Sequence, residues 1–211
     1  GLEWADVEPL IRTKLGQLEN VDIRLYPPAG APAAADMRTA GPTPRMTPGR
    51  AALIELIGRY SAVAVEGATP IAVQKLMYFL QEAGEQLSLR YESNHYGPYA
   101  DNLRAVLRDI EGHYLEGFGD GSRRIEVSEP FRLLLGARDA ALQILNDRKE
   151  TLDRIDRVME LTSGFESATS LELLATVHWV AMHPMAAGRS AEDIVPGCPR
   201  WSNRKARLVP P

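Results

Sequence analysis

Hydrophobic residues recur at helical spacing through most of the chain after residue 47. Thr47-Pro48 and Thr69-Pro70 each place a hydroxyl that can cap a helix before a proline, whose missing amide costs nothing in the first turn. We therefore expect helices to begin at both prolines. The second of these helices is apolar nearly all round, which is typical of a helix at the centre of a core. Further stripes predict helices around residues 103–114, 130–146, 152–159 and 173–181.

Two other segments predict β structure. Hydrophobic residues alternate with others over 87–91, as in a short strand, and the hairpin-turn dipeptide Asp120-Gly121 separates residues 114–118 from 124–127. The expected order is therefore helix, helix, strand, helix, hairpin, which is the order of a winged-helix-like domain. We expect a mainly α fold with a small β-hairpin, of the α+β class, in which additional helices surround a winged-helix-like core.

The composition changes abruptly near the start of the chain. Prolines, glycines and alanines crowd residues 28–49, which predicts a linker, because proline neither continues a helix nor pairs within a sheet. Before it, Asp6 can cap one amphipathic helix, and residues 21–25 alternate as one half-buried strand. One helix and one strand cannot bury enough surface to fold alone. We expect residues 1–27 to belong to a domain whose body is missing from this chain, and residues 50–211 to form a helical domain.

The composition also bears on chemistry. The 211 residues are 45% hydrophobic and carry a net charge of −4, and no apolar run is long enough to cross a bilayer. The one cysteine, Cys198, cannot build a disulfide framework, and His178 and His183 lie five residues apart, which does not suit two ligands of one metal. No nucleophile elbow, phosphate-binding loop or dinucleotide motif is present. We expect a cytoplasmic protein with no cofactor, no metal site and no membrane contact.

The charge distribution argues against the usual use of a winged-helix-like fold, which is to bind duplex DNA. Residues 101–172 contain 10 basic and 15 acidic side chains, and a negative surface repels the phosphates that supply most nucleic-acid affinity. We therefore expect no direct contact with nucleic acid. A DNA-binding regulator that uses Arg123, Arg124 and the cluster at 200–207 stays as an alternative.

The segment Asn94-His95-Tyr96-Gly97-Pro98-Tyr99 is the most specific local feature. Its tyrosines would lie beside a helix that begins at Pro98, with Asp101 and Asn102 in the first turn. Tyrosine gives a large contact area with a polar tip, so the segment suits an interface anchor. The alternative is that the two rings seal the top of the core, and the sequence does not separate these interpretations.

Carboxylates near the predicted hairpin add to this candidate surface. A row of spaced carboxylates can imitate the charges of a phosphate backbone and occupy a basic cleft built for nucleic acid. A second acidic row, at residues 153, 156 and 160, shares one helix face but is interspersed with arginines. The predicted partner-binding residues are Tyr96, Tyr99, Asp101, Asn102, Glu111, His113, Glu116 and Asp120.

Three segments carry a resemblance to a known family. Gln74–Gln81, Tyr96–Leu103 and Ile110–Tyr114 resemble the C-terminal region of the DarG antitoxins, which belong to the DarT–DarG toxin–antitoxin systems. The match spans most of residues 50–207. The K-L-x-Y-F and Y-G-P pattern is also similar to the Panacea antitoxin domain, which is a related interpretation.

The first residues resemble another part of the same family. Residues 1–4 and 21–27 are similar to the last helix and strand of a macrodomain of the type that removes ADP-ribose from nucleic acid. The resemblance implies that the macrodomain residues that act on ADP-ribose lie upstream of Gly1. We therefore expect that this chain is not an enzyme, and that the full-length protein carries ADP-ribosylglycohydrolase activity in its macrodomain.

The resemblance also implies a partner. DarT-type toxins ADP-ribosylate a base in single-stranded DNA, and the C-terminal region of a DarG-type antitoxin binds the toxin directly. We expect this chain to bind a DarT-type toxin by placing its acidic, tyrosine-bearing surface in the DNA groove, as a mimic of single-stranded DNA. The alternatives are the DNA-binding regulator and an accessory domain of a macrodomain DNA ADP-ribosylglycohydrolase.

Overall fold

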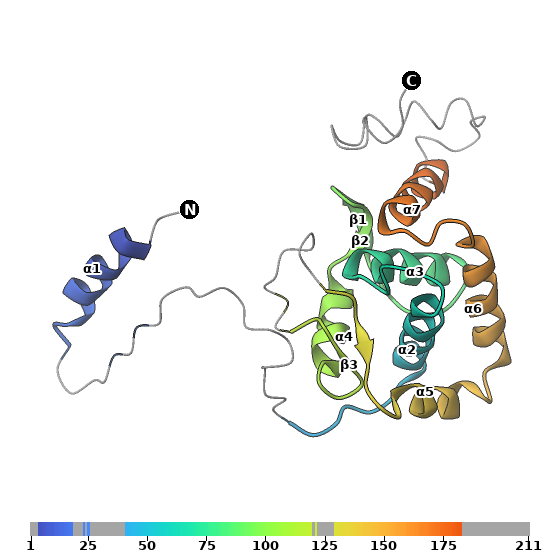
Figure 1. Cartoon of the computed structure of the whole chain (residues 1–211), viewed down its shortest axis with the longest axis horizontal. Helices are drawn as coiled ribbons and strands as arrows, with labels where there is room; N and C mark the ends of the chain where they lie inside the picture. The colour runs from blue at the N-terminus through green and yellow to red at the C-terminus, as the bar shows by residue number, and fades with distance from the viewer. Residues whose placement is uncertain are drawn as a thin grey trace. The chain divides into compact units, whose positions relative to one another are not determined.

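A computed structural model describes residues 4–18, 23, 25, 41–119, 121 and 129–182. The chain divides into two compact units, Gly1–Pro32 and Ala33–Pro211, whose boundary falls within the predicted linker. The first unit contains helix α1, Trp4–Leu15 (Figure 1). The strand predicted at 21–25 lies outside the described residues, apart from Ile23 and Leu25.

The second unit is mainly helical, with two antiparallel pairs of short strands. Its elements are α2 (Pro48–Ser61), α3 (Pro70–Glu82), β1 (Tyr91–Asn94), β2 (Gly97–Ala100), α4 (Asn102–Ile110), β3 (Leu115–Glu116), β4 (Arg132–Leu133), α5 (Ala137–Leu145), α6 (Lys149–Leu161) and α7 (Ala168–Met182). This architecture confirms the expected α+β class. The part from α2 to β4 follows the expected order, with a hairpin in place of the single strand, and α5, α6 and α7 are the additional helices (Figure 1).

Both predicted helix starts are confirmed. The Thr47 hydroxyl accepts a hydrogen bond from the Arg50 amide at 3.4 Å, and the Thr69 hydroxyl accepts one from the Ala72 amide at 3.3 Å. A proline occupies the first position of each helix. These two local signals fix where α2 and α3 begin, because they satisfy amides that a helix cannot bond internally.

Helix α3 is the centre of the second unit. All of its residues from Ala72 to Leu80 are buried, and it packs against α2, α6, α7 and β2 (Figure 1). The prediction of a central helix is thus confirmed. Because the helix is covered on every side, its polar side chains must find partners inside the protein.

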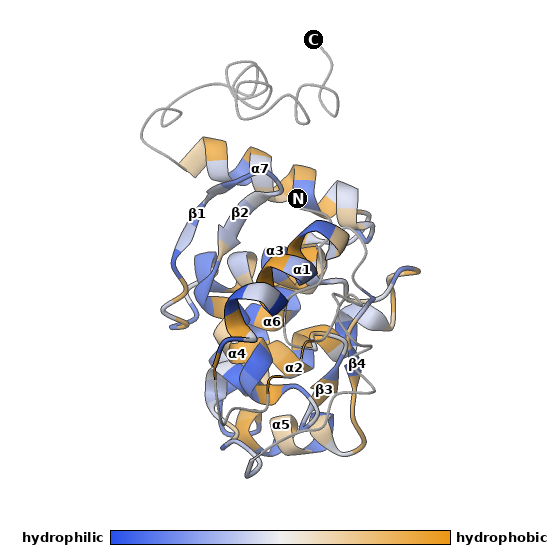
Figure 2. Ribbon diagram, turned by 90° about the vertical axis from the view of Figure 1, so that its left-hand side faces the viewer, coloured by the Kyte–Doolittle hydropathy of each residue, from blue (hydrophilic) through white to orange (hydrophobic). Residues whose placement is uncertain are grey.

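Helix α7 covers one side of α3 and also contacts β2. Hydrophobic residues predominate along it, as Figure 2 shows, and its buried residues include Leu171 and Ala175. The Tyr78 hydroxyl of α3 lies 2.7 Å from Nδ1 of His178 in α7. Burial lowers the pKa of His178, which favours the neutral imidazole at this contact. No helix of the described residues is both long and apolar enough to span a membrane.

A buried carboxylate connects α2 to two other helices. Glu55 is only 1% exposed, and it accepts hydrogen bonds from Arg138 of α5 at 2.8 and 3.0 Å. It also accepts one from Arg59 at 2.6 Å, and Arg59 in turn bonds to Asp156 of α6. A buried charge needs such partners, since an unpaired one is strongly destabilising.

We expect Glu55→Gln to remove part of the acid sensitivity of the fold. Burial raises the pKa of Glu55, but hydrogen bonds from Arg138 and Arg59 outweigh it, so the folded-state pKa lies below its ordinary value of 4.5. A depressed folded pKa gives stability that is present above the unfolded pKa and is lost as pH falls through the folded one. The free energy of unfolding should be measured from neutral pH to about pH 3. At neutral pH the variant should be less stable than the wild type by about 1–3 kcal/mol, and this difference should shrink as the pH falls. A stability difference that stays constant with pH would contradict this account.

The structure corrects three predicted boundaries. Pro98 does not begin a helix: it lies in β2 of a hairpin, and α4 begins at Asn102. The strand expected over 87–91 begins only at Tyr91. The helix expected from residue 130 begins at Ala137, because residues 132–133 pair with β3 instead. The partner strand predicted at 124–127 lies outside the described residues.

Candidate partner-binding site

Two polar side chains of α3 hold strand β2. The Ala100 amide donates to Oε1 of Gln74 at 3.0 Å, and Nε2 of Gln74 donates to the Ala100 carbonyl at 3.1 Å. Nζ of the fully buried Lys75 donates to the Pro98 carbonyl at 2.6 Å. Glutamine and lysine side chains thus take the place of a neighbouring strand, which explains polar residues in the most buried helix of the unit.

Pro98 suits its position in the strand pair. The register pairs Ser93 with Pro98 and Tyr91 with Ala100. In an antiparallel pair, alternate residues direct their N–H and C=O groups away from the partner strand. Pro98 has no N–H to satisfy, its carbonyl accepts from Lys75, and both groups of Ala100 are bonded to Gln74. The Gln-Lys segment of α3 and strand β2 therefore form one structural unit, through bonds between residues 23 and 26 positions apart.

The turn of this hairpin requires a glycine. Asn94 pairs with Gly97, so His95 and Tyr96 form the loop, and Gly97 has a φ of 86°. A Cβ atom at this position would lie 2.9 Å from the Thr176 hydroxyl of α7. Gly97 therefore permits both the left-handed turn and the close approach of α7, and together these place Tyr96 at the tip of the hairpin.

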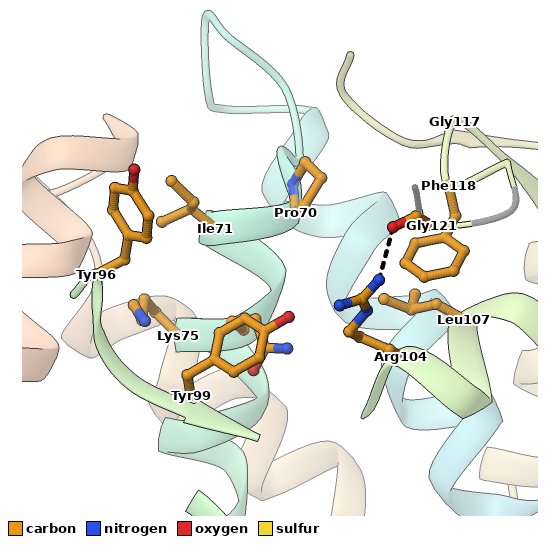
Figure 3. A pocket seen from close by; sticks show the side chains of 11 residues that line it. Pro70, Ile71, Lys75, Tyr96, Tyr99, Arg104, Leu107, Gly117, Phe118 and Gly121 are labelled. Atoms are coloured by element: carbon orange, nitrogen blue, oxygen red, sulfur yellow. Dashed lines mark hydrogen bonds between the residues drawn. The ribbon is translucent and has the colours of Figure 1, made fainter. Parts of the chain in front are cut away.

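A small pocket of about 60 Å³ opens beside the hairpin tip. Tyr96 and Tyr99 lie on one side of it, and Arg104 and Phe118 lie on the other (Figure 3). The complete lining is Pro70, Ile71, Gln74, Lys75, Tyr96, Tyr99, Arg104, Leu107, Gly117, Phe118 and Gly121. The pocket thus joins the hairpin, the first turns of α3, helix α4 and the loop after β3.

Three of the predicted residues lie at the start of α4 or just before it. Asp101 is 87% exposed, with its carboxylate 3.8 Å from the Arg104 guanidinium. Tyr99 is partly buried, and burial raises its pKa, so the ring stays neutral. Asn102 has a different role: its side chain donates to the Ser88 carbonyl at 3.1 Å and accepts from the Arg90 amide at 3.0 Å. Asn102 therefore fastens the chain before β1 to α4.

The predicted carboxylates near β3 have partners within the unit. Glu111 accepts hydrogen bonds from three backbone amides, those of residues 117–119, at 3.0 to 3.1 Å. Glu116 forms an ion pair with Arg132 of β4 at 2.7 Å. His113 is partly buried in the turn after α4, and Asp120 lies outside the described residues.

The structure thus brings together only part of the predicted set. Tyr96 and Tyr99 line one pocket. Asp101 forms an ion pair with Arg104, which lines the same pocket, whereas Glu116 is not part of the lining. Arg104 was not among the residues predicted from the sequence, although it lies three residues after Asp101, the residue before α4. Phe118 was predicted only as part of the hairpin segment 114–118. Within the residues that the structure describes, no group of three or more histidine, cysteine or acidic side chains is arranged to hold a metal ion.

The chain is similar to known proteins over nearly its whole length. A DNA ADP-ribosyl glycohydrolase of Thermus aquaticus is 40% identical over 206 residues, which are 98% of this chain and 55% of that protein. Proteins of the same name from Mycobacterium tuberculosis and Mycobacterium bovis are 34% identical over 220 residues, covering 99% of this chain and 61% of their own length. No protein-family model matches the chain. The chain is therefore similar to DNA ADP-ribosyl glycohydrolases over nearly its whole length, and it spans little more than half of theirs.

These relatives correct one expectation from the sequence. We expected the chain not to be an enzyme, because the family resemblance implies that the macrodomain residues that act on ADP-ribose lie upstream of Gly1. The relatives that match 98–99% of the chain are named for an enzymatic activity, which contradicts that expectation.

Proposed function

We propose that this chain belongs to a DarG-type antitoxin, and that its helical unit binds a DarT-type toxin that ADP-ribosylates single-stranded DNA. The glycohydrolase activity for which the relatives are named is proposed for the whole protein. The similarity to these relatives supports the proposal, because it covers the helical unit as well as the first residues. The motifs that resemble DarG antitoxins, Gln74–Gln81 and Tyr96–Leu103, are also those that build the hairpin and its pocket.

The observation that carries the toxin-binding proposal is the grouping of two tyrosines and an exposed carboxylate at one pocket. A protein that holds single-stranded DNA offers a basic groove with surfaces on which bases stack. Tyr96 and Tyr99 can supply rings in place of bases, and Asp101 can supply a charge in place of a phosphate. The excess of acidic residues over 101–172 favours the same orientation in a basic groove.

Within this proposal, the eight predicted residues divide by their surroundings. Tyr96, Tyr99 and Asp101 are proposed as direct contacts with the toxin, and His113 and Glu116 as contacts at the edge of the surface. Asp120, which lies outside the described residues, stays a predicted contact. Asn102 and Glu111 bond to backbone groups of their own unit, so their part in the surface is to hold its loops.

The experiment that tests this function is co-purification of the full chain with a DarT-type toxin, followed by competition with a single-stranded oligonucleotide. We expect a stable complex that weakens as salt rises and that the oligonucleotide displaces. A complex that forms equally well with saturating oligonucleotide would contradict DNA mimicry. The absence of any complex would contradict toxin binding itself.

A second candidate function is that the helical unit assists the glycohydrolase reaction. The observation in its favour is that relatives named for the activity match 98–99% of this chain. The test is the release of ADP-ribose from a modified oligonucleotide by a full-length relative, with and without the region that corresponds to residues 50–211. A loss of release without any loss of toxin binding would favour this candidate.

A further inference from the structure

The carboxylate of Glu111 is held by the loop that follows β3. Its two oxygens accept from the backbone amides of Gly117, Phe118 and Gly119, at 3.1, 3.1 and 3.0 Å. Three successive amides that converge on one point form a concave anion site, a nest, and a carboxylate is the side chain that fits it best. Glu111 is thus the acceptor around which this loop folds.

Glu111 lies at the C-terminal end of α4, where an acidic residue needs an explanation. Glu111 directly follows Ile110, the last residue of the helix, and its amide donates to the Leu107 carbonyl. A negative charge at a helix C-terminus is unfavourable, because the carbonyl ends already carry negative potential. Helix formation therefore does not explain an acidic residue here, whereas the three loop amides do.

The loop that Glu111 holds forms one wall of the pocket. Phe118 and Gly121 line the pocket, and Nη2 of Arg104 donates to the Gly121 carbonyl at 2.6 Å (Figure 3). On its other side the loop is closely packed: a Cβ atom at Gly117 would lie 3.1 Å from the Pro130 carbonyl oxygen. The place of Phe118 relative to Tyr96 therefore depends on the bonds that Glu111 accepts.

We propose that Glu111 is a positioning residue for partner binding: its carboxylate sets residues 117–119, and so the pocket wall that Phe118 forms opposite the two tyrosines, and it does not itself contact the partner. This inference rests on the proposed toxin-binding function. It separates Glu111 from Asp101, whose carboxylate lies 3.8 Å from Arg104 but is 87% exposed and so accessible to a partner's basic groups.

The test compares three substitutions in the full chain. Glu111→Gln removes the charge, and Glu111→Asp keeps the charge but withdraws it by one methylene from the amides. Asp109→Asn is the matched control, because Asp109 lies on the same helix, is 59% exposed and pairs with Arg50 instead of the loop. Amide hydrogen exchange of residues 117–119 in the free protein should rise about tenfold in both Glu111 variants and stay unchanged in Asp109→Asn. Retained protection of the α3 amides shows that each variant is folded.

Toxin affinity measured over a range of salt concentrations gives the second readout. A positioning role predicts that both Glu111 variants bind about tenfold more weakly, with the salt dependence of the wild type. Protection of 117–119 that stays intact in both variants would overturn the proposal. So would normal binding by Glu111→Asp together with weaker, less salt-dependent binding by Glu111→Gln, since that pattern belongs to a charge in direct contact. A wild-type chain that does not bind the toxin contradicts the proposed function, and the exchange rates then decide whether Glu111 holds the loop.

Discussion

Replacement of Lys75 with alanine is expected to lower the free energy of unfolding by about 3–5 kcal/mol. The substitution leaves the buried Pro98 carbonyl without its donor, which costs about 1–3 kcal/mol, and it removes about three buried methylene groups at about 0.8 kcal/mol each. Because Lys75 also holds β2 against α3, the hairpin that carries Tyr96 should become less ordered. Denaturant unfolding followed by circular dichroism measures the first effect, and amide exchange of β2 measures the second.

The matched control for this prediction is Lys149→Ala. Lys149 is exposed at the start of α6, so the same change of side chain should alter stability by less than about 0.5 kcal/mol. If Lys75→Ala were as stable as Lys149→Ala, the bond to Pro98 would not contribute to the fold, and the account of β2 as a strand held by side chains would be wrong.

A double substitution at the hairpin surface, Tyr96→Ala with Asp101→Lys, is expected to weaken toxin binding about 100-fold. The first change removes an aromatic anchor at the pocket. The second reverses a charge that is 87% exposed, so a basic partner groove would repel it. Titration calorimetry with a DarT-type toxin measures the loss, and an unchanged melting temperature excludes unfolding as its cause.

The other acidic row supplies the control. Asp153→Lys reverses an exposed carboxylate on α6, away from the pocket lining, and should change affinity by less than about threefold. If Asp153→Lys abolished binding while the double variant at the hairpin bound normally, the toxin would dock on α6, and the proposed surface would be on the wrong side of the unit.

The helix starts could be predicted because their signals are local. Thr47 and Thr69 each bond to an amide three residues later, so the sequence contains both partners within one turn. The β1–β2 hairpin was missed because the contacts that form it join residues far apart in the sequence. Pro98 is compatible with a helix start when only its neighbours are considered, and it becomes a strand residue because Lys75, 23 positions earlier, supplies the donor to its carbonyl.

The candidate site also has one part that local sequence features predict and another that depends on long-range contacts. Tyr96, Tyr99 and Asp101 were predicted from their side chains alone, and the structure places them at or beside one pocket. The sequence also indicated Glu111 as a surface charge, but its acceptor geometry depends on the amides of a loop whose path no spacing rule gives. Arg104 was missed because its contact, the Gly121 carbonyl, becomes a neighbour only after that loop has folded.

The capping of β2 by Gln74 and Lys75 has a consequence for behaviour at high concentration. A strand with free N–H and C=O groups along its edge is a template on which a second molecule can add a strand, and such additions begin edge-to-edge aggregation. On β2 the outward groups of Pro98 and Ala100 are already bonded to α3, or absent in the case of the proline amide. This edge of the hairpin is therefore closed to strand addition, although two-stranded ribbons are among the most open of β structures.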